Sequence, residues 1–222
     1  MRRALAGVIL TFLAIAPALP AEPTLLIEDW SRQAAGTRGV PEGWTARSWG
    51  TANYDFTLVV EGSGKVLHLR SDNDNSTIGK EVKVDLKQFP ILVWRWKGVT
   101  LPRGGDSRRS ETDDQAAQVY VVFPRFPDWR SRIIGYVWDT TAPAGAIVPS
   151  KKTSTVTYVI VRSGEAELGR WITETRNVYE DYKRIYGAAP GEDVGAVSVA
   201  IDSNDTRSRA ESFMGEIFFR KP

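Results

Sequence analysis

Apolar and polar residues alternate with a period of two along most of the chain from Leu25 to Pro222. This alternation is typical of strands that bury one face and expose the other. Turn-forming residues interrupt it at short intervals, as in sandwiches and barrels. One segment, residues 178–187, has a helical pattern that ends at Gly187, with Pro190 beyond it. We therefore predict an all-β fold, a jelly-roll β-sandwich of about ten strands with one short helix.

The strands are predicted from short β-rich runs between polar loops. The first pair is a hairpin. The runs are DFTLVVEGSGKVLHLRS for the hairpin, then STIGKEVKVDL, ILVWRWKGVTL, AAQVYVVFP, RIIGYVWD, STVTYVIVRSG, RWITETRNV, VGAVSVAID and ESFMGEIFFR. The loops LPRGGDSRRSETDD and DTTAPAGAIVPSKK between them are long enough to carry a functional site.

The first 21 residues have the pattern of a secretory signal peptide. Arg2 and Arg3 precede an apolar run over residues 4–16, and small residues follow. The apolar run is shorter than the roughly 20 residues that span a bilayer. We therefore expect residues 1–21 to be cleaved and residues 22–222 to form one extracytoplasmic domain, periplasmic or secreted, with no membrane span.

Charge and residue counts exclude several classes of function. The chain has 29 Lys and Arg against 27 Asp and Glu, and the leader holds two of the basic residues, so the mature domain is neutral overall. Nucleic acid is therefore not an expected partner, since its recognition needs a basic surface. With no cysteine and one histidine, His68, a zinc site or a cysteine nucleophile is excluded. His68 lies between Leu67 and Leu69, and we interpret it as a strand residue without a catalytic role.

The alternation predicts a sheet face that carries aromatic rings and arginines. In ILVWRWK, Leu92, Trp94 and Trp96 share one face and Arg95 lies on the other. If the strands lie in one sheet, its outer face carries Arg95, Tyr120, Tyr136, Trp138, Tyr158 and Arg162. Aromatic rings stack on the apolar face of a sugar, while charged groups hydrogen-bond its hydroxyls. The alternative is that these aromatic residues simply fill a sandwich core.

Carboxylates at strand ends are candidates for further contacts or for chemistry. Asp113 and Asp114 precede a strand, Asp139 ends another, and Glu174 lies within a third. A pair of such carboxylates would serve glycoside hydrolysis, and the alternative is that they are turn residues. We include Asp114 and Glu174 among the candidate ligand-binding residues and assign no catalytic residue.

Asp202, Asn204 and Asp205 are candidates for a structural Ca²⁺ site. Their oxygens suit a hard cation, although the segment lacks the glycine and glutamate of an EF-hand loop. The alternative is a turn built on Asp and Asn side chains. We therefore predict either no cofactor or a structural calcium ion.

Long collinear motifs carry a family resemblance. The runs LPRGGDSRRSETDDQAAQVYVVFPRF, IIGYVWD, LGRWITETRNVYEDYKRIYG and AIDSNDTRSRAESFMGEIFF resemble the bacterial domain-of-unknown-function family 3047 over about Leu25 to Arg220. That resemblance implies a secreted β-rich domain and supplies no catalytic residues. VKVDLKQFPILVWRWKG and MGEIFF are also similar to galactose-binding-like jelly rolls, which implies carbohydrate binding, a structural calcium, and a first strand LLIEDW close to the last.

These observations favour a non-catalytic module that binds a polysaccharide or glycan outside the cytoplasm. The alternatives are a glycoside hydrolase or lyase that uses Asp and Glu pairs, and an envelope domain that docks another protein through exposed aromatic residues.

Overall fold

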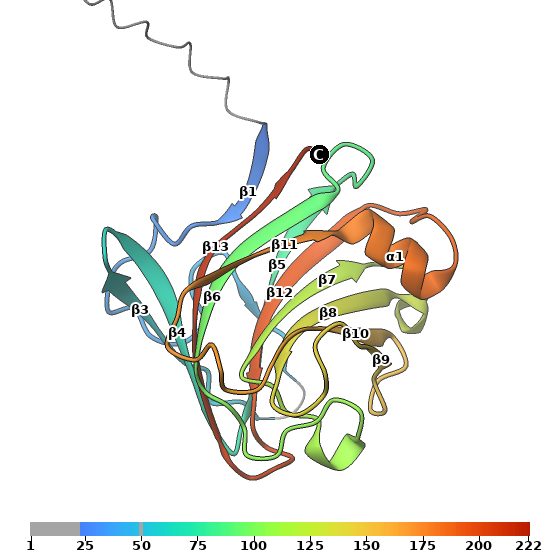
Figure 1. The fold of residues 1–222 in the computed structure, drawn as a ribbon. Helices are drawn as coiled ribbons and strands as arrows, with labels where there is room; N and C mark the ends of the chain where they lie inside the picture. The colour runs from blue at the N-terminus through green and yellow to red at the C-terminus, as the bar shows by residue number, and fades with distance from the viewer. Residues whose placement is uncertain (1–22, 49–50) are drawn as a thin grey trace, which may run out of the picture.

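The computed structural model describes residues 23–48 and 51–222. The predicted signal peptide over residues 1–21 therefore lies outside the described residues. Two mostly antiparallel sheets face each other and enclose the core (Figure 1). The predicted β-sandwich is therefore confirmed. Within the described residues, no helix is long and apolar enough to cross a membrane.

The sandwich has a six-stranded and a seven-stranded sheet. The six-stranded sheet is ordered β11-β6-β13-β4-β3, with β1 also paired to β13, and the seven-stranded sheet is ordered β2-β5-β12-β7-β8-β10-β9. The strands are β1 (Thr24–Glu28), β2 (Thr45–Ala46), β3 (Asp55–Glu61), β4 (Gly64–Asp72), β5 (Asn75–Val84), β6 (Ile91–Thr100), β7 (Ala117–Phe123), β8 (Arg132–Asp139), β9 (Ile147–Pro149), β10 (Val156–Ser163), β11 (Ile172–Asn177), β12 (Val194–Asp202) and β13 (Arg209–Arg220). The helices are η1 (Ser110–Thr112), η2 (Asp128–Arg130) and α1 (Val178–Tyr186).

Local sequence signals predicted several secondary-structure elements correctly. The predicted hairpin is β3 and β4, which pair antiparallel from Asp55 and Arg70 to Glu61 and Gly64. The predicted helix is α1, which Asn177 caps by accepting a hydrogen bond from the Glu180 amide, and which ends at Gly187 with a φ of 75°. The opening strand β1 pairs with the closing strand β13, as the jelly-roll resemblance implied. The short strand β9 was not predicted, because it lies in a segment that reads as a loop.

Large aromatic side chains join the two sheets. Trp94 and Trp96 of β6 project inward, as the alternation predicted, and meet Tyr136 and Trp138 of β8 in the opposite sheet. The ring centroids are 5.3 Å apart for Trp94 and Tyr136 and 6.0 Å apart for Trp96 and Trp138. All four side chains are almost completely buried. The middle of the sandwich is therefore filled by rings contributed from both sheets.

Replacing a ring of this inter-sheet group should be costly. We expect Trp138→Ala to lower the free energy of unfolding by about 3 to 5 kcal/mol, since the vacated space cannot fully collapse. The control Trp129→Ala removes a tryptophan that is 75% exposed and should change stability by no more than about 0.5 kcal/mol. Urea denaturation of both variants measures this. Equal losses in the two variants would contradict the assignment of Trp138 to the core.

Candidate functional site

A row of side chains crosses the outer face of the six-stranded sheet. Phe213 of β13 is directly opposite Lys97 of β6 and His68 of β4, and His68 is opposite Thr57 of β3. Trp171, next to the start of β11, extends the row on the other side of Lys97, since Ile172 pairs with Trp96. Because neighbouring residues of these strands are buried in the core, the row itself points away from it. We call Trp171, Lys97, Phe213 and His68 the outer aromatic row.

The rings of this row contact one another. The His68 and Phe213 rings are stacked, with centroids 4.2 Å apart and planes 3° apart. The Trp171 and Phe213 centroids are 6.4 Å apart at an angle of 61°. All three side chains are half-buried. The face therefore presents a ring platform of fixed shape, because each ring restricts the rotation of its neighbour.

Cations lie against the rings. The Arg95 guanidinium is 4.3 Å from the centre of the Trp171 ring, and the Lys97 ammonium is 4.2 Å from the centre of the Phe213 ring. Both distances are in the range of cation–π attraction. The platform thus combines π faces with N–H donors, which is the pairing that a polyhydroxylated ligand needs.

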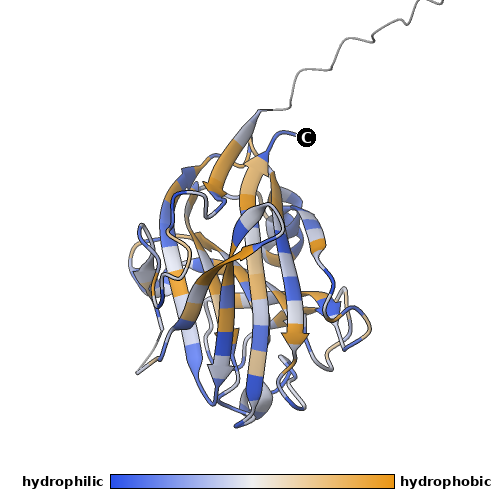
Figure 2. Cartoon of the chain, turned by 90° about the vertical axis from the view of Figure 1, so that its left-hand side faces the viewer, coloured by the Kyte–Doolittle hydropathy of each residue, from blue (hydrophilic) through white to orange (hydrophobic). Residues whose placement is uncertain are grey.

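The β3–β4 hairpin supplies acceptors at the edge of this platform. It projects from the left-hand side of the molecule in Figure 1 and comes to the front in Figure 2. Glu61 near its tip accepts a hydrogen bond from the Trp171 indole N–H at 3.1 Å and pairs with the Lys97 ammonium. Burial favours the neutral acid, but the hydrogen bonds from Lys97 and Trp171 outweigh it and lower the pKa of Glu61. Glu61 is therefore ionised at neutral pH and acts as an acceptor.

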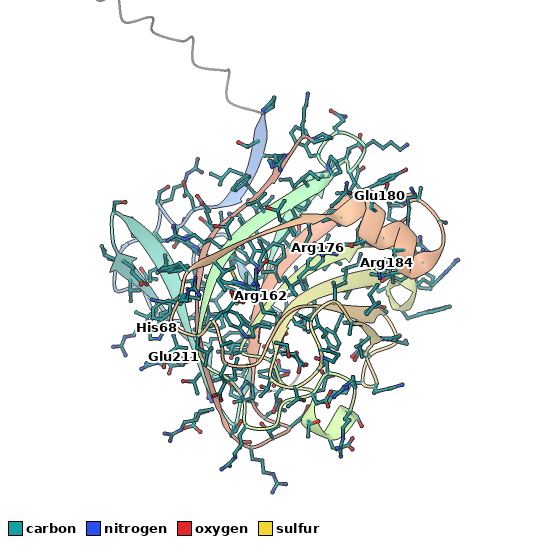
Figure 3. The ribbon with its side chains drawn as sticks, in the orientation of Figure 1. His68, Arg162, Arg176, Glu180, Arg184 and Glu211 are labelled. Atoms are coloured by element: carbon teal, nitrogen blue, oxygen red, sulfur yellow. The ribbon has the colours of Figure 1, made fainter. Side chains whose placement is uncertain are left out.

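His68 pairs with a second carboxylate on the same face. Its Nε2 atom is 2.7 Å from an Oε1 atom of Glu211, and the two residues lie together at one side of the molecule in Figure 3. Glu211 is two residues from Phe213 on β13, and hence on the same face. The outer aromatic row, which includes the Lys97 ammonium, is thus bordered by two carboxylates, Glu61 and Glu211, and by the Arg95 guanidinium.

Of the predicted ligand residues, Arg95 alone lies on this platform. The placement of Tyr136 and Trp138 on an outer face is wrong, since both lie in the core. The prediction assumed that all these strands share one sheet. Because β6 and β8 belong to opposite sheets, their aromatic residues meet across the core instead of lining one surface.

Arg162 and Glu174 come together, but inside the sandwich. A β-bulge between Ile160 and Arg162 shifts the register of β10, so Arg162 is opposite the inward-facing Trp138. Its guanidinium binds both oxygens of Glu174, at 2.6 and 3.2 Å, and Glu174 also accepts from the Trp96 indole N–H at 3.2 Å. The pair links β10 to β11 across the two sheets. The predicted outward placement of Arg162 is therefore wrong, and the carboxylate of the candidate ligand residue Glu174 is engaged by Arg162 and Trp96.

Tyr120 and Tyr158 lie on the outer face of the seven-stranded sheet, away from the outer aromatic row. The segment from Ala142 to Val148 packs over this face and forms a second small hydrophobic cluster with Tyr158. Gly135 lies between the two tyrosines, where a Cβ atom would be 2.7 Å from the Tyr120 ring. The two rings are therefore packing residues beneath a loop and do not form an open surface with Arg95.

The acidic residues of the long loop hold the structure together. Asp114 is fully buried and accepts hydrogen bonds from the amides of Asp205 and Thr206, at 3.1 and 2.6 Å. It fastens the loop between β12 and β13, so its predicted role as a ligand residue is not supported by its position. Asp139 similarly accepts from the amides of Ser107 and Thr141.

Two of the three predicted calcium ligands, Asp202 and Asp205, already have protein partners. Asp202 accepts from the Asn75 amide at 2.9 Å, Asp205 pairs with the Lys152 ammonium, and Asn204 is exposed. Among residues 23–48 and 51–222, no group of three acidic, histidine or cysteine side chains is arranged to hold a metal ion. The Lys152 ammonium supplies the positive charge that a cation would bring. The calcium ion stays a prediction.

The sequence contained signals for the residues that were missed. Along β4, the alternation places His68 on the outward face and its neighbours Leu67 and Leu69 on the inward face. Along β13, it places Phe213 on the outward face and Met214 on the inward face. Trp171 stands at the start of a predicted strand. What the sequence does not contain is the strand order that brings these residues side by side, since β4, β13, β6 and β11 are distant in the chain.

Asp113 provides a test of the buried polar network. It accepts hydrogen bonds from Gln115 at 2.7 Å and from the Tyr158 hydroxyl at 3.2 Å, and burial raises its pKa to about 6. The folded protein thus binds this proton more tightly than the unfolded chain does. The contribution of Asp113 to stability therefore falls as the pH rises from about 4 to about 6.

We expect Asp113→Asn to reduce that loss. Between pH 4 and pH 6 its free energy of unfolding should fall less than that of the wild type, by on the order of 1 to 3 kcal/mol. Denaturant titrations at both pH values measure the difference. Asp128→Asn, which removes an exposed carboxylate, is the control and should follow the wild type. Parallel profiles for all three proteins would refute the assignment.

Solved structures with a related architecture include three carbohydrate-associated domains. The CBM22-1 xylan-binding domain of Paenibacillus barcinonensis Xyn10C is 13% identical, with 92% of this chain and 97% of that chain covered and a TM-score of 0.42. The xyloglucanase domain of NopAA from Sinorhizobium fredii is 11% identical, with 87% and 99% covered and a TM-score of 0.43. The family 30 carbohydrate-binding module of Clostridium thermocellum Cel9D-Cel44B is 11% identical, with 84% and 96% covered and a TM-score of 0.43. At these values we draw no functional argument from them.

Sequence comparison identifies a family. No curated protein matches the chain. A family model described as a protein of unknown function, DUF3047, matches residues 42–218, which is most of the chain and includes every residue of the outer aromatic row. The chain belongs to the DUF3047 family of proteins of unknown function.

Proposed function

We propose that this protein is a non-catalytic carbohydrate-binding domain and that the outer aromatic row is its binding face. The observation that carries the proposal is the lateral register of Trp171, Lys97, Phe213 and His68 across neighbouring strands. Rings in line across a sheet offer successive stacking surfaces to an extended polymer. Glu61, Glu211 and Arg95 at the border supply acceptors and donors for its hydroxyl groups.

The charge pattern of the face supports a polar ligand over an apolar one. Lys97 and Glu61 pair with each other, and so do His68 and Glu211. Each pair leaves further lone pairs or N–H groups for a ligand. A purely hydrophobic partner would leave these remaining lone pairs and N–H groups buried without hydrogen bonds, at a considerable cost in free energy.

The state of the carboxylates supports binding without hydrolysis. A glycosidase needs an acid with a raised pKa next to the substrate. On this face, the pKa of Glu61 is lowered. The pKa values of Asp113 and Asp202 are raised by burial, but neither residue is on this face: Asp113 is buried against Tyr158 and Gln115, and Asp202 is buried at the end of β12 in the seven-stranded sheet. The carboxyl groups with raised pKa values therefore lie away from the platform.

The leader sequence supports an extracytoplasmic site of action. Residues 1–21 have the pattern of a cleaved signal peptide. A domain exported in this way would meet polysaccharides of the cell envelope or of the surroundings. A periplasmic or secreted location would therefore bring the outer aromatic row into contact with such polysaccharides.

Trp171 is the most direct residue to test. A glycan array probed with the mature domain should return a ligand, and Trp171→Ala should weaken its affinity about tenfold, equivalent to about 1.4 kcal/mol of lost stacking. Trp129→Ala is the matched control, because Trp129 is exposed on the loop between β7 and β8 and is outside the row. Unchanged affinity in Trp171→Ala, or an equal loss in Trp129→Ala, would reject the outer aromatic row as the binding face.

Catalysis is tested separately with the bound polysaccharide as substrate. After prolonged incubation with the mature domain we expect no new reducing ends and no unsaturated ends, since the carboxyl groups with raised pKa values, Asp113 and Asp202, lie away from the platform. Release of either product, abolished by Glu61→Gln or Glu211→Gln, would show that the domain is a hydrolase or lyase instead. Asp128→Asn serves as the control for a lost surface charge.

A further inference from the structure

The outer face of the six-stranded sheet continues beyond the aromatic row into a cavity lined with arginines. Arg209, Glu211 and Phe213 alternate along β13 and therefore share one face. Arg209 pairs with Asp72 at the end of β4, and Phe213 pairs with His68 further along the same two strands. Four residues along a strand cover about 13 Å. The cavity and the platform thus belong to one continuous track.

The cavity has a volume of about 360 Å³ and is lined by residues from three strand ends, those of β4, β6 and β13, and from two loops. Three guanidinium groups, those of Arg103, Arg207 and Arg209, border it, together with a single carboxylate, Asp72. Arg209 donates from Nε to Asp72 at 2.9 Å. In the described part of the chain, the side chains of Arg103 and Arg207 form no ion pair or hydrogen bond. The cavity therefore carries an excess of positive charge although the domain as a whole is neutral.

The fold holds these arginines together through hydrogen bonds between the two loops. The Arg103 amide donates to the Ser208 hydroxyl at 3.1 Å, and that hydroxyl is 2.7 Å from the Thr206 hydroxyl. Thr206 is in turn fixed by the buried Asp114. Arg207 between them has a φ of 48°, in the left-handed region that arginine rarely adopts. The backbone segments that carry Arg103 and Arg207 are thus held next to each other by hydrogen bonds.

We infer that this cavity binds the acidic group of an anionic sugar, a carboxylate or a sulfate ester, on the same polymer that stacks on the outer aromatic row. The inference rests on the proposed function, because it assigns the chemical class of the glycan. Guanidinium groups bind such oxyanions through paired N–H donors in a planar fork. A neutral polymer would leave two guanidiniums without a counter-charge. An acidic polymer neutralises them while its sugar rings follow the track toward Phe213 and Trp171.

The experiment compares polymers that differ only in charge. Polygalacturonate against its methyl ester tests a carboxylate, and dextran sulfate against dextran tests a sulfate. In at least one pair the charged polymer should bind the mature domain about tenfold more tightly at low ionic strength, and salt should erode this preference. The double variant Arg103→Gln/Arg207→Gln should lose the preference and keep its thermal stability, since both side chains are exposed.

The matched control is Arg130→Gln/Arg184→Gln, which removes two exposed charges elsewhere, from η2 and α1. It should keep the preference. No charge preference in either pair, a preference that survives in Arg103→Gln/Arg207→Gln, or an equal loss in the control would overturn the inference. Binding of neutral glycans through Trp171 would leave the proposed function standing in each of these cases.

The cavity is also tested without any glycan. Inorganic sulfate is titrated into the mature domain, and the arginine Nε–H signals are followed by NMR. Saturable shifts at Arg103 and Arg207, absent with chloride at equal ionic strength, would support the anion site even if every polymer failed to bind. Shifts that do not saturate, or that chloride reproduces, would overturn it.

Discussion

The packing of aromatic side chains between the two sheets determines what the surface presents. Trp94 and Trp96 bury their rings against Tyr136 and Trp138, which contributes several kcal/mol of hydrophobic stabilisation per ring. Because side chains alternate along a strand, placing these two tryptophans inside forces Arg95 and Lys97 outside. A shift of β6 by one residue would expose two tryptophans and bury two cations, so the register is strongly specified.

The neighbouring strands are fixed in the same way. Met214 of β13 and Leu67 of β4 lie in the core, and so Phe213 and His68 face outward beside Lys97. Core packing thus determines where the residues of the outer aromatic row lie. It does not determine which residue types stand at those positions. Core packing requires no ring at an outward position, so it does not account for the three rings of Trp171, Phe213 and His68. The loops at the end of the same face then add the arginine cavity.

Much of the fold could be predicted from local sequence patterns, because strands, the β3–β4 hairpin and α1 each depend on residues close in the chain. The site could be predicted only in part. Arg95 was placed on an outer face by the alternation around Trp94, which is a local property. Tyr136 and Trp138 were misplaced because local patterns do not show which strands share a sheet. That assignment depends on the whole topology. Arg162 was misplaced because one bulged residue reverses the faces of β10, and no residue type marks that bulge.

On the proposed binding face, a glycan lies across Trp171, Phe213 and His68. The most direct test of this placement is an NMR titration of the labelled mature domain with the best ligand from a glycan array. We expect saturable shifts of the Trp171 indole N–H and of the backbone amides of Phe213 and His68, and no shift of the Trp129 indole N–H. Shifts confined to the loop of Trp129, or to the buried network around Asp113, would contradict it.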